Sequence, residues 1–279
     1  MSSLIARSLS IYQNQGAKTL LKRAFKKARR DAYYRTMSIR GECSLTLEGW
    51  TVRFSAPSVA MVERNHERFN SEKEELADFL DEIRADDVVY DIGANTGLYS
   101  LFAANECPDG NVIAFEPYPP NLDLLKQDIS RNGFEHIEVI EMALSNSVGT
   151  IGFSQPKESD IGYGSSAIGP GDNKDTIEVP TTTGDQLIDD GEIPPPNVVK
   201  IDVEGAEPLV IDGLERALSA PSCRVVYCEV HLPGNERRPS VEDFDSSATD
   251  IRNRFEEFGF TAEKLPRGDR AELFYKFSK

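Results

Sequence analysis

The sequence predicts an α/β fold in which helices cover both faces of a mostly parallel β-sheet. From Asp87 onward, short apolar runs alternate with stretches of helical periodicity, which is typical of parallel strands joined by crossover helices. Two further strand-like runs, 259–265 and 271–277, end the chain with no helix between them. We expect these two to form an antiparallel pair at the sheet edge. A chain of 279 residues is long enough for one large domain with an appended segment.

Residues 1–70 are predicted to form this appended segment, and residues 71–279 the domain. Apolar side chains recur at three- and four-residue spacing between basic ones over residues 17–36, which predicts a basic helix. The runs SLTLEG and WTVRFS, joined at Glu48-Gly49, predict a β-hairpin. Ser71 followed by Glu74 matches a capping box, so a helix should run from there to about Ile83.

The sheet elements follow in order. Strands are expected at 88–92, 111–115, 137–141, 197–202 and 224–230, each a short apolar run bounded by turn residues. Helices are expected near 97–105, 119–132, 206–218 and 241–258. Gly133 should end the second of these helices, and Ser240 should open the last. A looser β-rich insert is predicted over 149–183, with YGSS and GPGDN as turns.

Charge and cysteine content narrow the class of protein. The net charge is −16, but residues 1–40 carry +9 and the remainder −25. An acidic domain body argues against nucleic-acid binding. The four cysteines include no C-x-x-C pair, so neither a zinc site nor a disulfide framework is expected. No apolar run approaches the roughly 20 residues of a membrane span, and the N-terminus lacks a secretory signal. We therefore expect an acidic cytoplasmic enzyme.

The basic helix leaves two interpretations open. Its Leu21 and Phe25, surrounded by lysine and arginine, could lie on an anionic membrane surface, which would make the protein membrane-peripheral. Alternatively, residues 17–36 dock on the protein's own acidic domain or form a mobile tail.

Ligands of open α/β sheets bind at the carboxyl ends of the strands. The first strand ends in the turn DIGANTG, in which Gly93 and Gly97 allow a ligand to approach the backbone closely. This turn departs from G-x-G-x-x-G, and Asp91 precedes it. A ligand with an ammonium and a sulfonium group, but no pyrophosphate, suits such a turn. Glu116 lies 19 residues beyond Gly97 and is suited to grip two ribose hydroxyls.

Five segments together resemble a known family. VVYDIGANTGLYSL, VIAFEPYPPNLDLLKQDI, VIEMALSNSVG, VPTTTGDQLI and VVKIDVEGAEPLVIDGL occur in this order. They look like the FkbM family of S-adenosylmethionine-dependent methyltransferases over roughly residues 72–231. The resemblance implies a class I methyltransferase fold, a Rossmann-like three-layer sandwich. It also implies methyl transfer, usually to a hydroxyl of a sugar, glycan or small metabolite.

The same resemblance implies roles for individual residues. The methionine part of the cofactor would be cradled by the glycine turn, and the ribose by Glu116. Met142 or Ala143 would touch the adenine, and Asp202 would face the methyl donor. The implied S-adenosylmethionine site therefore comprises Asp91, Gly93, Asn95, Thr96, Gly97, Glu116, Met142, Ala143 and Asp202.

Transfer to a hydroxyl requires removal of its proton. Four side chains at the ends of the later strands are the candidate bases: Asp202, Glu204, Glu229 and His231. Carboxylates and a histidine at one rim could also bind a divalent cation, but the sequence favours proton transfer over a metal site. Arg237-Arg238, in a loop at the same rim, is either a contact for an anionic acceptor or a pair of solvated arginines.

Two other functions compete with methyl transfer. A nicotinamide-dependent oxidoreductase could use a similar sheet, although the glycine turn and the sequence FEP argue against it. A non-catalytic binding module could have kept the fold, but Asp91, Gly93, Glu116 and Asp202 are all intact.

Overall fold

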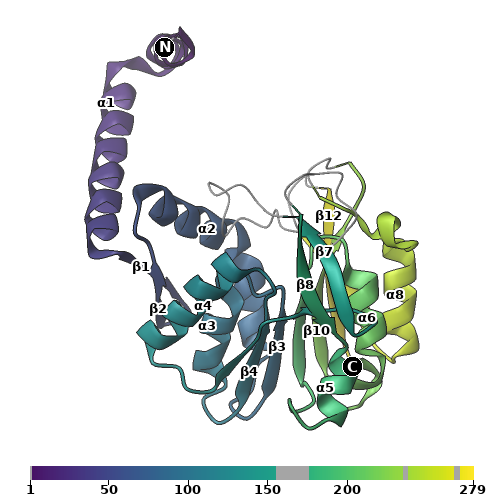
Figure 1. The fold of residues 1–279 in the computed structure, drawn as a ribbon. Coiled ribbons are helices and arrows are strands. Elements are labelled where there is room, and N and C mark those ends of the chain that lie inside the picture. The colour runs from purple at the N-terminus through teal and green to yellow at the C-terminus, as the bar shows by residue number, and fades with distance from the viewer. Residues whose placement is uncertain (1, 155–175, 235–237, 267–270) are drawn as a thin grey trace.

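The computed structural model describes residues 2–154, 176–234, 238–266 and 271–279. At its centre is a seven-stranded sheet in the order β11-β12-β10-β9-β3-β4-β5 (Figure 1). The strands are β3 (Val88–Ile92), β4 (Asn111–Phe115), β5 (Ile137–Ile140), β9 (Val198–Ile201), β10 (Val225–His231), β11 (Thr261–Leu265) and β12 (Glu272–Ser278). From β5 to β10 all neighbours pair in parallel, whereas β12 runs antiparallel to both β10 and β11. The predicted fold class, including the antiparallel closing pair, is confirmed.

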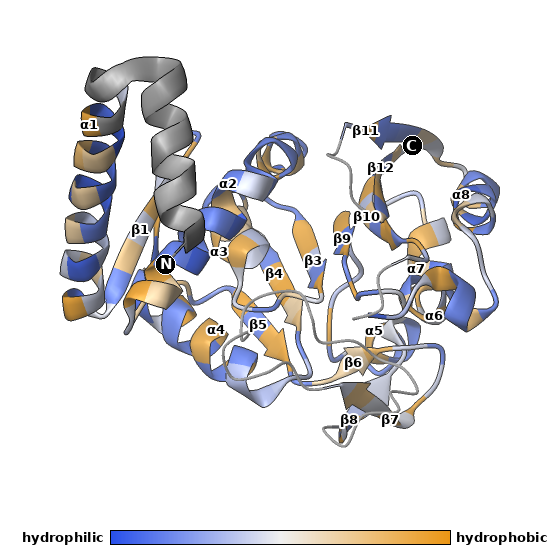
Figure 2. Ribbon diagram, turned by 90° about the horizontal axis from the view of Figure 1, so that it is seen from above, coloured by the Kyte–Doolittle hydropathy of each residue, from blue (hydrophilic) through white to orange (hydrophobic). Residues whose placement is uncertain are grey.

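Helices cover both faces of this sheet because successive strand residues point to opposite sides. Val89, Val112 and Val198 pack on one side in a core with α2 (Val59–Asp81) and α3 (Leu98–Glu106). Their neighbours in sequence pack on the other side, against helices that follow the insert. Those helices are α5 (Gly184–Asp189), α6 (Glu207–Gly213), α7 (Glu215–Ser219) and α8 (Ala248–Glu257). Figure 2 shows hydrophobic positions gathered in β3, β4 and β9, as expected for strands buried on both faces.

α4 (Pro119–Asn132) lies on the α3 side, where its Leu125 packs with Ala114 of β4. It begins with the Pro119-Pro120 pair and ends at Gly133, whose φ is 74°. The bounds predicted for this helix are confirmed.

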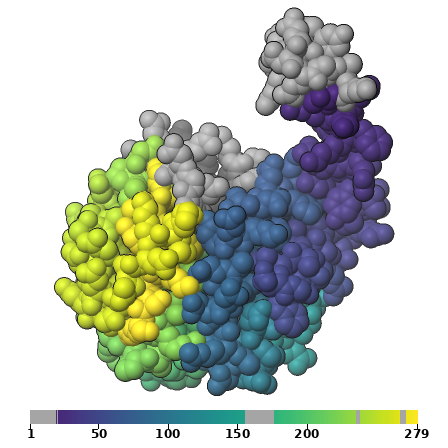
Figure 3. All heavy atoms as spheres, turned by 180° about the vertical axis from the view of Figure 1, so that it is seen from behind, coloured from purple at the N-terminus to yellow at the C-terminus, as the bar shows by residue number. Residues whose placement is uncertain are grey.

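The N-terminal segment consists of a long helix and a hairpin. α1 runs over Ser2–Arg40, well beyond the predicted 17–36. β1 (Glu42–Leu47) and β2 (Trp50–Ser55) pair antiparallel around Glu48-Gly49, which confirms the hairpin. The last turns of α1 pack on α2, where the rings of Tyr34 and His66 stack 5.3 Å apart. The part of α1 drawn in purple in Figure 3 projects from the rest of the molecule.

The predicted helix start at Ser71 is wrong. α2 begins thirteen residues earlier, after Ser58, whose hydroxyl accepts a hydrogen bond from the backbone N–H of Met61. Ser71 lies inside the helix, and its hydroxyl donates to the carbonyl of Arg68. The helix is longer because Val62, Phe69 and Leu76 all pack in the core. The division at residue 70 stays a prediction, and α2 crosses that position.

Two predicted helices are divided in the structure. The predicted helix 206–218 breaks at Leu214 into α6 and α7. Gly213 packs so closely on Ser145 that an added Cβ would lie 2.0 Å from its carbonyl oxygen. Ser240 does form a capping box, but it opens only the 3₁₀ turn η2 (Val241–Phe244), and α8 starts later, after Ser247.

The insert forms a small second sheet, in the order β6-β8-β7. Its strands are β6 (Ala143–Leu144), β7 (Gly149–Ser154) and β8 (Thr176–Thr182), so its β-rich character is confirmed. The predicted turns YGSS and GPGDN lie outside the described residues. Within the described part of the chain, no helix has the length and apolar character needed to cross a membrane.

Candidate active site

The glycine turn between β3 and α3 fits tightly against two neighbouring strands. Gly93 and Gly97 have φ values of 83° and 85°, in the left-handed region that favours glycine. The Gly93 N–H donates to the carbonyl of Phe115, at the end of β4. On the opposite side, a Cβ added to Gly93 would lie 1.9 Å from the carbonyl oxygen of Asp202. The turn therefore leaves no room for a side chain at residue 93.

A pocket opens beside this turn. Seven of the residues predicted from sequence line it: Gly93, Asn95, Glu116, Met142, Ala143, Asp202 and Glu204. Apolar walls are added by Ile92, Phe115, Phe153 and Val203. Asp91, Thr96 and Gly97 are not among the lining residues. The structure thus brings together the ends of four segments that are far apart in the sequence.

Glu116 ties the pocket's wall to the glycine turn. Its Oε2 accepts a hydrogen bond from the Asn95 N–H, and its Oε1 from the Tyr118 N–H, both at 2.8 Å. Its side chain is buried, and this burial raises the pKa of Glu116 to about 7 although the hydrogen bonds oppose it. Each carboxylate oxygen keeps lone-pair capacity for a hydroxyl of a bound ligand.

Asp91 lies beneath the turn and not in the pocket. Its Oδ2 accepts hydrogen bonds from the backbone N–H and the hydroxyl of Ser100 in α3. On its other side, the ammonium of Lys200 lies 4.0 Å from Asp91 Oδ1 and 3.0 Å from Asp202 Oδ2. Asp91 therefore joins the helix start to a buried lysine, and a contact of its own with a ligand stays a prediction.

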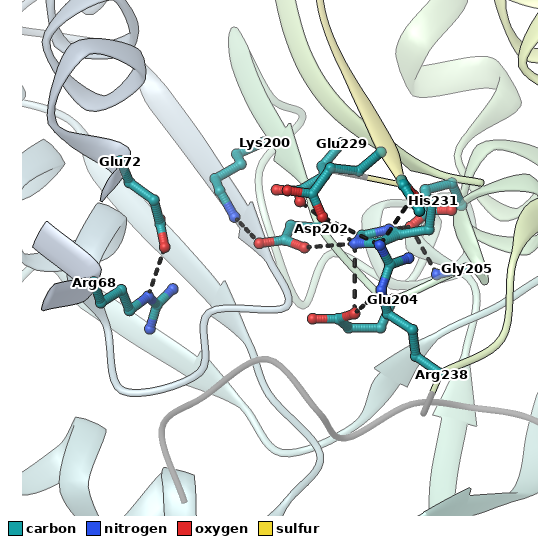
Figure 4. Close-up of polar contacts among 12 residues, drawn as sticks. Arg68, Glu72, Lys200, Asp202, Glu204, Gly205, Glu229, His231 and Arg238 are labelled. Atoms are coloured by element: carbon teal, nitrogen blue, oxygen red, sulfur yellow. Dashed lines mark hydrogen bonds and ion pairs between the residues drawn. The ribbon is translucent and has the colours of Figure 1, made fainter. Parts of the chain in front are cut away.

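Lys200 was not identified from the sequence. Burial lowers the pKa of this lysine, but Asp202 and Asp91 outweigh that effect and hold its pKa above the ordinary value. The signal was a lysine inside the apolar run VVKI, of which all four residues are buried. Arg68 was also missed. It reaches the same region from α2 (Figure 4), and its Nε lies 3.1 Å from Glu72 Oε1.

The four predicted catalytic residues meet around His231, which is 1% exposed. Its Nε2 lies 3.4 Å from Glu204, 3.5 Å from Glu229 and 3.9 Å from Asp202. Its Nδ1 lies 2.7 Å from Oε1 of Glu207, the first residue of α6. Burial opposes protonation of His231, but these carboxylates outweigh it and raise its pKa well above the ordinary value.

Arg238 is not a solvated arginine, and its contact with an anionic acceptor stays a prediction. Its side chain is 6% exposed, and its guanidinium forms ion pairs with Glu204 at 3.3 Å and Glu272 at 3.1 Å. It is therefore a buried partner of the acidic cluster and not a solvated residue. Arg237 lies outside the described residues.

Comparison with known proteins decides the family. A model described as the methyltransferase FkbM domain matches residues 91–262. The chain belongs to the FkbM methyltransferase family. This FkbM-family chain is 32% identical over 198 residues to the hexuronic acid methyltransferase AglP of Haloferax volcanii, a match that covers 71% of the chain and 77% of the relative.

Two more distant matches are a curated protein and a solved structure. The 31-O-demethyl-FK506 methyltransferase FkbM of Streptomyces tacrolimicus is 28% identical over 180 residues, or 54% of this chain and 67% of the relative. A precorrin-6y C5,15-methyltransferase structure from Geobacter metallireducens has a TM-score of 0.46 and 16% identity, covering 74% of this chain and 87% of that one.

This FkbM-family protein is thus an S-adenosylmethionine-dependent methyltransferase, and the oxidoreductase and the non-catalytic module are set aside. The site fits the cofactor. Gly93 can hold only glycine, the Glu116 carboxylate lines the pocket between two backbone donors, and apolar side chains line the remaining walls. Such a pocket offers acceptors for ribose hydroxyls and flat contacts for an adenine ring.

Proposed function

We propose that this enzyme transfers a methyl group to an oxygen of a sugar acid, of the hexuronic acid class, in a glycan or a smaller conjugate. The observation that carries the proposal is the 32% identity to a hexuronic acid methyltransferase over 77% of that protein's length. The identity to a 31-O-methylating enzyme supports oxygen as the methylated atom.

The chain's own residues supply binding and orientation. S-adenosylmethionine, when bound, supplies the methyl group. We infer that Glu116 accepts hydrogen bonds from its ribose and that Met142 and Ala143 contact its adenine, because all three line the pocket. Asp202 and Glu204 line the same pocket next to the His231 cluster, where an acceptor would have to lie.

Glu204 is the side chain best suited to accept a proton from an acceptor hydroxyl. Burial and the neighbouring Asp202 and Glu229 raise its pKa to about 8, although His231 and Arg238 oppose the shift. A carboxylate of that basicity accepts a proton more readily than an ordinary one. Its backbone is held at a φ of 54°, an uncommon value for a residue with a side chain that often marks a functional position.

The test is an acceptor assay with matched sugars. The purified protein would be incubated with S-adenosylmethionine and an oligosaccharide that ends in glucuronic acid, or in glucose as the control. We expect S-adenosylhomocysteine and a mass gain of one methylene with the acid only. Mild alkali would then distinguish an ester, which it cleaves, from an ether. If the protein binds S-adenosylhomocysteine but methylates no uronic acid, the proposed acceptor is wrong.

A further inference from the structure

We propose that Asp202, Glu229 and His231 bind a divalent cation of the Mg²⁺ or Mn²⁺ type beside the cofactor pocket. Each residue offers one ligand atom, and the three atoms lie within 4.8 Å of one another. Ligands of one ion at about 2.1 Å lie about 3 Å apart when adjacent and about 4.2 Å apart when opposite. From His231 Nε2, Glu229 lies at 3.5 Å and Asp202 at 3.9 Å. Shifts of a few tenths of an ångström would therefore close the site.

Glu207 orients the imidazole in the way that a residue hydrogen-bonded to a metal ligand orients that ligand. Its Oε1 lies 2.7 Å from His231 Nδ1 and accepts a hydrogen bond from the Gly205 N–H. Glu207 is fully buried, so this partnership is not shared with solvent. A carboxylate on Nδ1 fixes the proton there and turns the Nε2 lone pair toward the other side chains, which is the arrangement found at histidine metal ligands.

The charge of the cluster favours a cation. Besides Glu204, three carboxylates lie within 3.9 Å of this one imidazole: Asp202, Glu207 and Glu229. Among the described residues, Lys200 lies between Asp91 and Asp202, and Arg238 lies between Glu204 and Glu272. Arg68, which reaches the same region, is paired with Glu72. Buried negative charge in excess is costly, and a divalent ion would offset it.

The location of the cation site connects it to the proposed function. Only the role of the cation in the reaction rests on that proposed function. Asp202 lines the cofactor pocket and also contributes to the cluster. The pocket's polar side chains include Glu116, Asp202 and Glu204, so an acidic sugar would meet carboxylates of its own sign. Three protein ligands leave coordination positions open on a six-coordinate ion. A bound cation would attract the acceptor's carboxylate and lower the pKa of a coordinated hydroxyl.

The ligand types select the kind of ion. Two carboxylate oxygens and one imidazole nitrogen form a mostly hard set, which suits Mn²⁺ and Mg²⁺ better than ions that require thiolates. The competing arrangement is a protonated His231 that balances the carboxylates by its own charge, and it would leave no ligand for a metal. Titration with an ion separates the two arrangements.

Mn²⁺ alone is the probe. Protein stripped with a chelator would be titrated with Mn²⁺ while the free ion is followed by electron paramagnetic resonance. We expect one site per chain, competition by Mg²⁺, and a nitrogen coupling from the imidazole in spin-echo spectra. This experiment needs no variant. The proposal is wrong if no Mn²⁺ binds, or if the bound Mn²⁺ shows no nitrogen coupling.

Variants assign the ligands. Glu229→Gln and His231→Gln should each weaken Mn²⁺ binding by about tenfold or more, and Glu207→Gln by about 10- to 100-fold through misorientation of His231. The exposed Glu257→Gln is the matched control. Binding of S-adenosylhomocysteine confirms that each variant is folded. Unchanged Mn²⁺ binding in both ligand variants would contradict the assignment. Mn²⁺ binding without methylation of a uronic acid would instead contradict only the proposed acceptor.

Discussion

Gly93 is the residue at which the cofactor turn comes closest to β9. Two separate effects would destabilise a variant with a side chain at residue 93. One is the φ of 83°, and the other is the 1.9 Å approach of an added Cβ to the Asp202 carbonyl oxygen. Gly133, at the end of α4, has a φ of 74° and nothing within 4 Å of an added Cβ. The two glycines therefore share the conformation but not the crowding, and they make a matched pair.

We expect Gly133→Ala to reduce the free energy of unfolding by about 1 to 2 kcal/mol, the cost of left-handed backbone for a residue with a Cβ. Gly93→Ala should cost more and should also abolish S-adenosylhomocysteine binding, because the turn and β9 must separate. Denaturant unfolding and calorimetric titration measure the two effects. Equal stability losses, with binding retained in both variants, would show that the turn is not packed as described.

The pKa of Glu116 makes cofactor binding depend on pH. At a pKa of about 7, the carboxyl is mostly protonated at pH 6 and mostly ionised at pH 8. The ionised form accepts hydrogen bonds more strongly, and with its full set of lone pairs, than the protonated form. We expect affinity for S-adenosylhomocysteine to rise about tenfold from pH 6 to pH 8, with this slope absent in Glu116→Gln and retained in the exposed control Glu138→Gln.

The same shift affects stability in the opposite direction. Because the pKa in the folded protein lies above the ordinary glutamate value of 4.5, folding favours the protonated carboxyl. The contribution of Glu116 to the free energy of unfolding is therefore full below pH 4.5 and is lost as the pH rises through 7. A pH series of unfolding curves for Glu116→Gln and the unaltered protein would measure it.

At the element scale, the two serines of α2 test where that helix begins. Ser58 caps the first turn, and its loss should cost about 1 kcal/mol. Ser71 lies mid-helix, where alanine has the higher helix propensity, so Ser71→Ala should be neutral or slightly stabilising. Thermal unfolding of Ser58→Ala and Ser71→Ala compares them directly. If Ser71→Ala proved more destabilising than Ser58→Ala, the helix start predicted at Ser71 would be supported instead.

The sequence predicted elements well where local and tertiary signals agree. β4 and α4 have the predicted bounds, because apolar strands and proline and glycine at helix ends are local features. It failed at α2 and at the α6–α7 break, which are decided by packing: Phe69 lies in the core, and Gly213 is pressed against Ser145. Neither contact is visible in a local pattern.

The site, too, was predicted where local patterns decide and was missed where tertiary packing decides. The strand ends predicted that Asp202, Glu204, Glu229 and His231 would meet, because carboxyl ends of parallel strands share one edge. Arg68 escaped notice because its helix was predicted to start at Ser71. The placement of Arg238 in the acidic cluster depends on a loop and on Glu272 of β12, which are distant in sequence.

At the scale of the whole molecule, α1 presents an uncovered basic and apolar surface. Leu21 and Phe25 are 70% and 71% exposed, so this part of α1 is not docked on the acidic domain. We expect the protein to co-sediment with anionic vesicles and not with neutral ones, with binding lost at high salt. Replacing Leu21 and Phe25 by serine should weaken it, whereas the exposed Val148→Ser should not. Absence of binding at low salt would leave α1 without a membrane role.

The order of strands also determines when the site can form. β3 lies in the middle of the sheet between β4, which follows soon after it, and β9. The N–H of Val88 donates to Asn197, 109 positions later. At about 5–20 residues per second on the ribosome, β3 waits roughly 5–20 s for that partner. During this interval the edge of β3 that pairs with β9 is unpaired, and the helices that cover one of its faces have not yet been made. The cofactor pocket, bounded by Gly93 and Asp202, is a late product of synthesis.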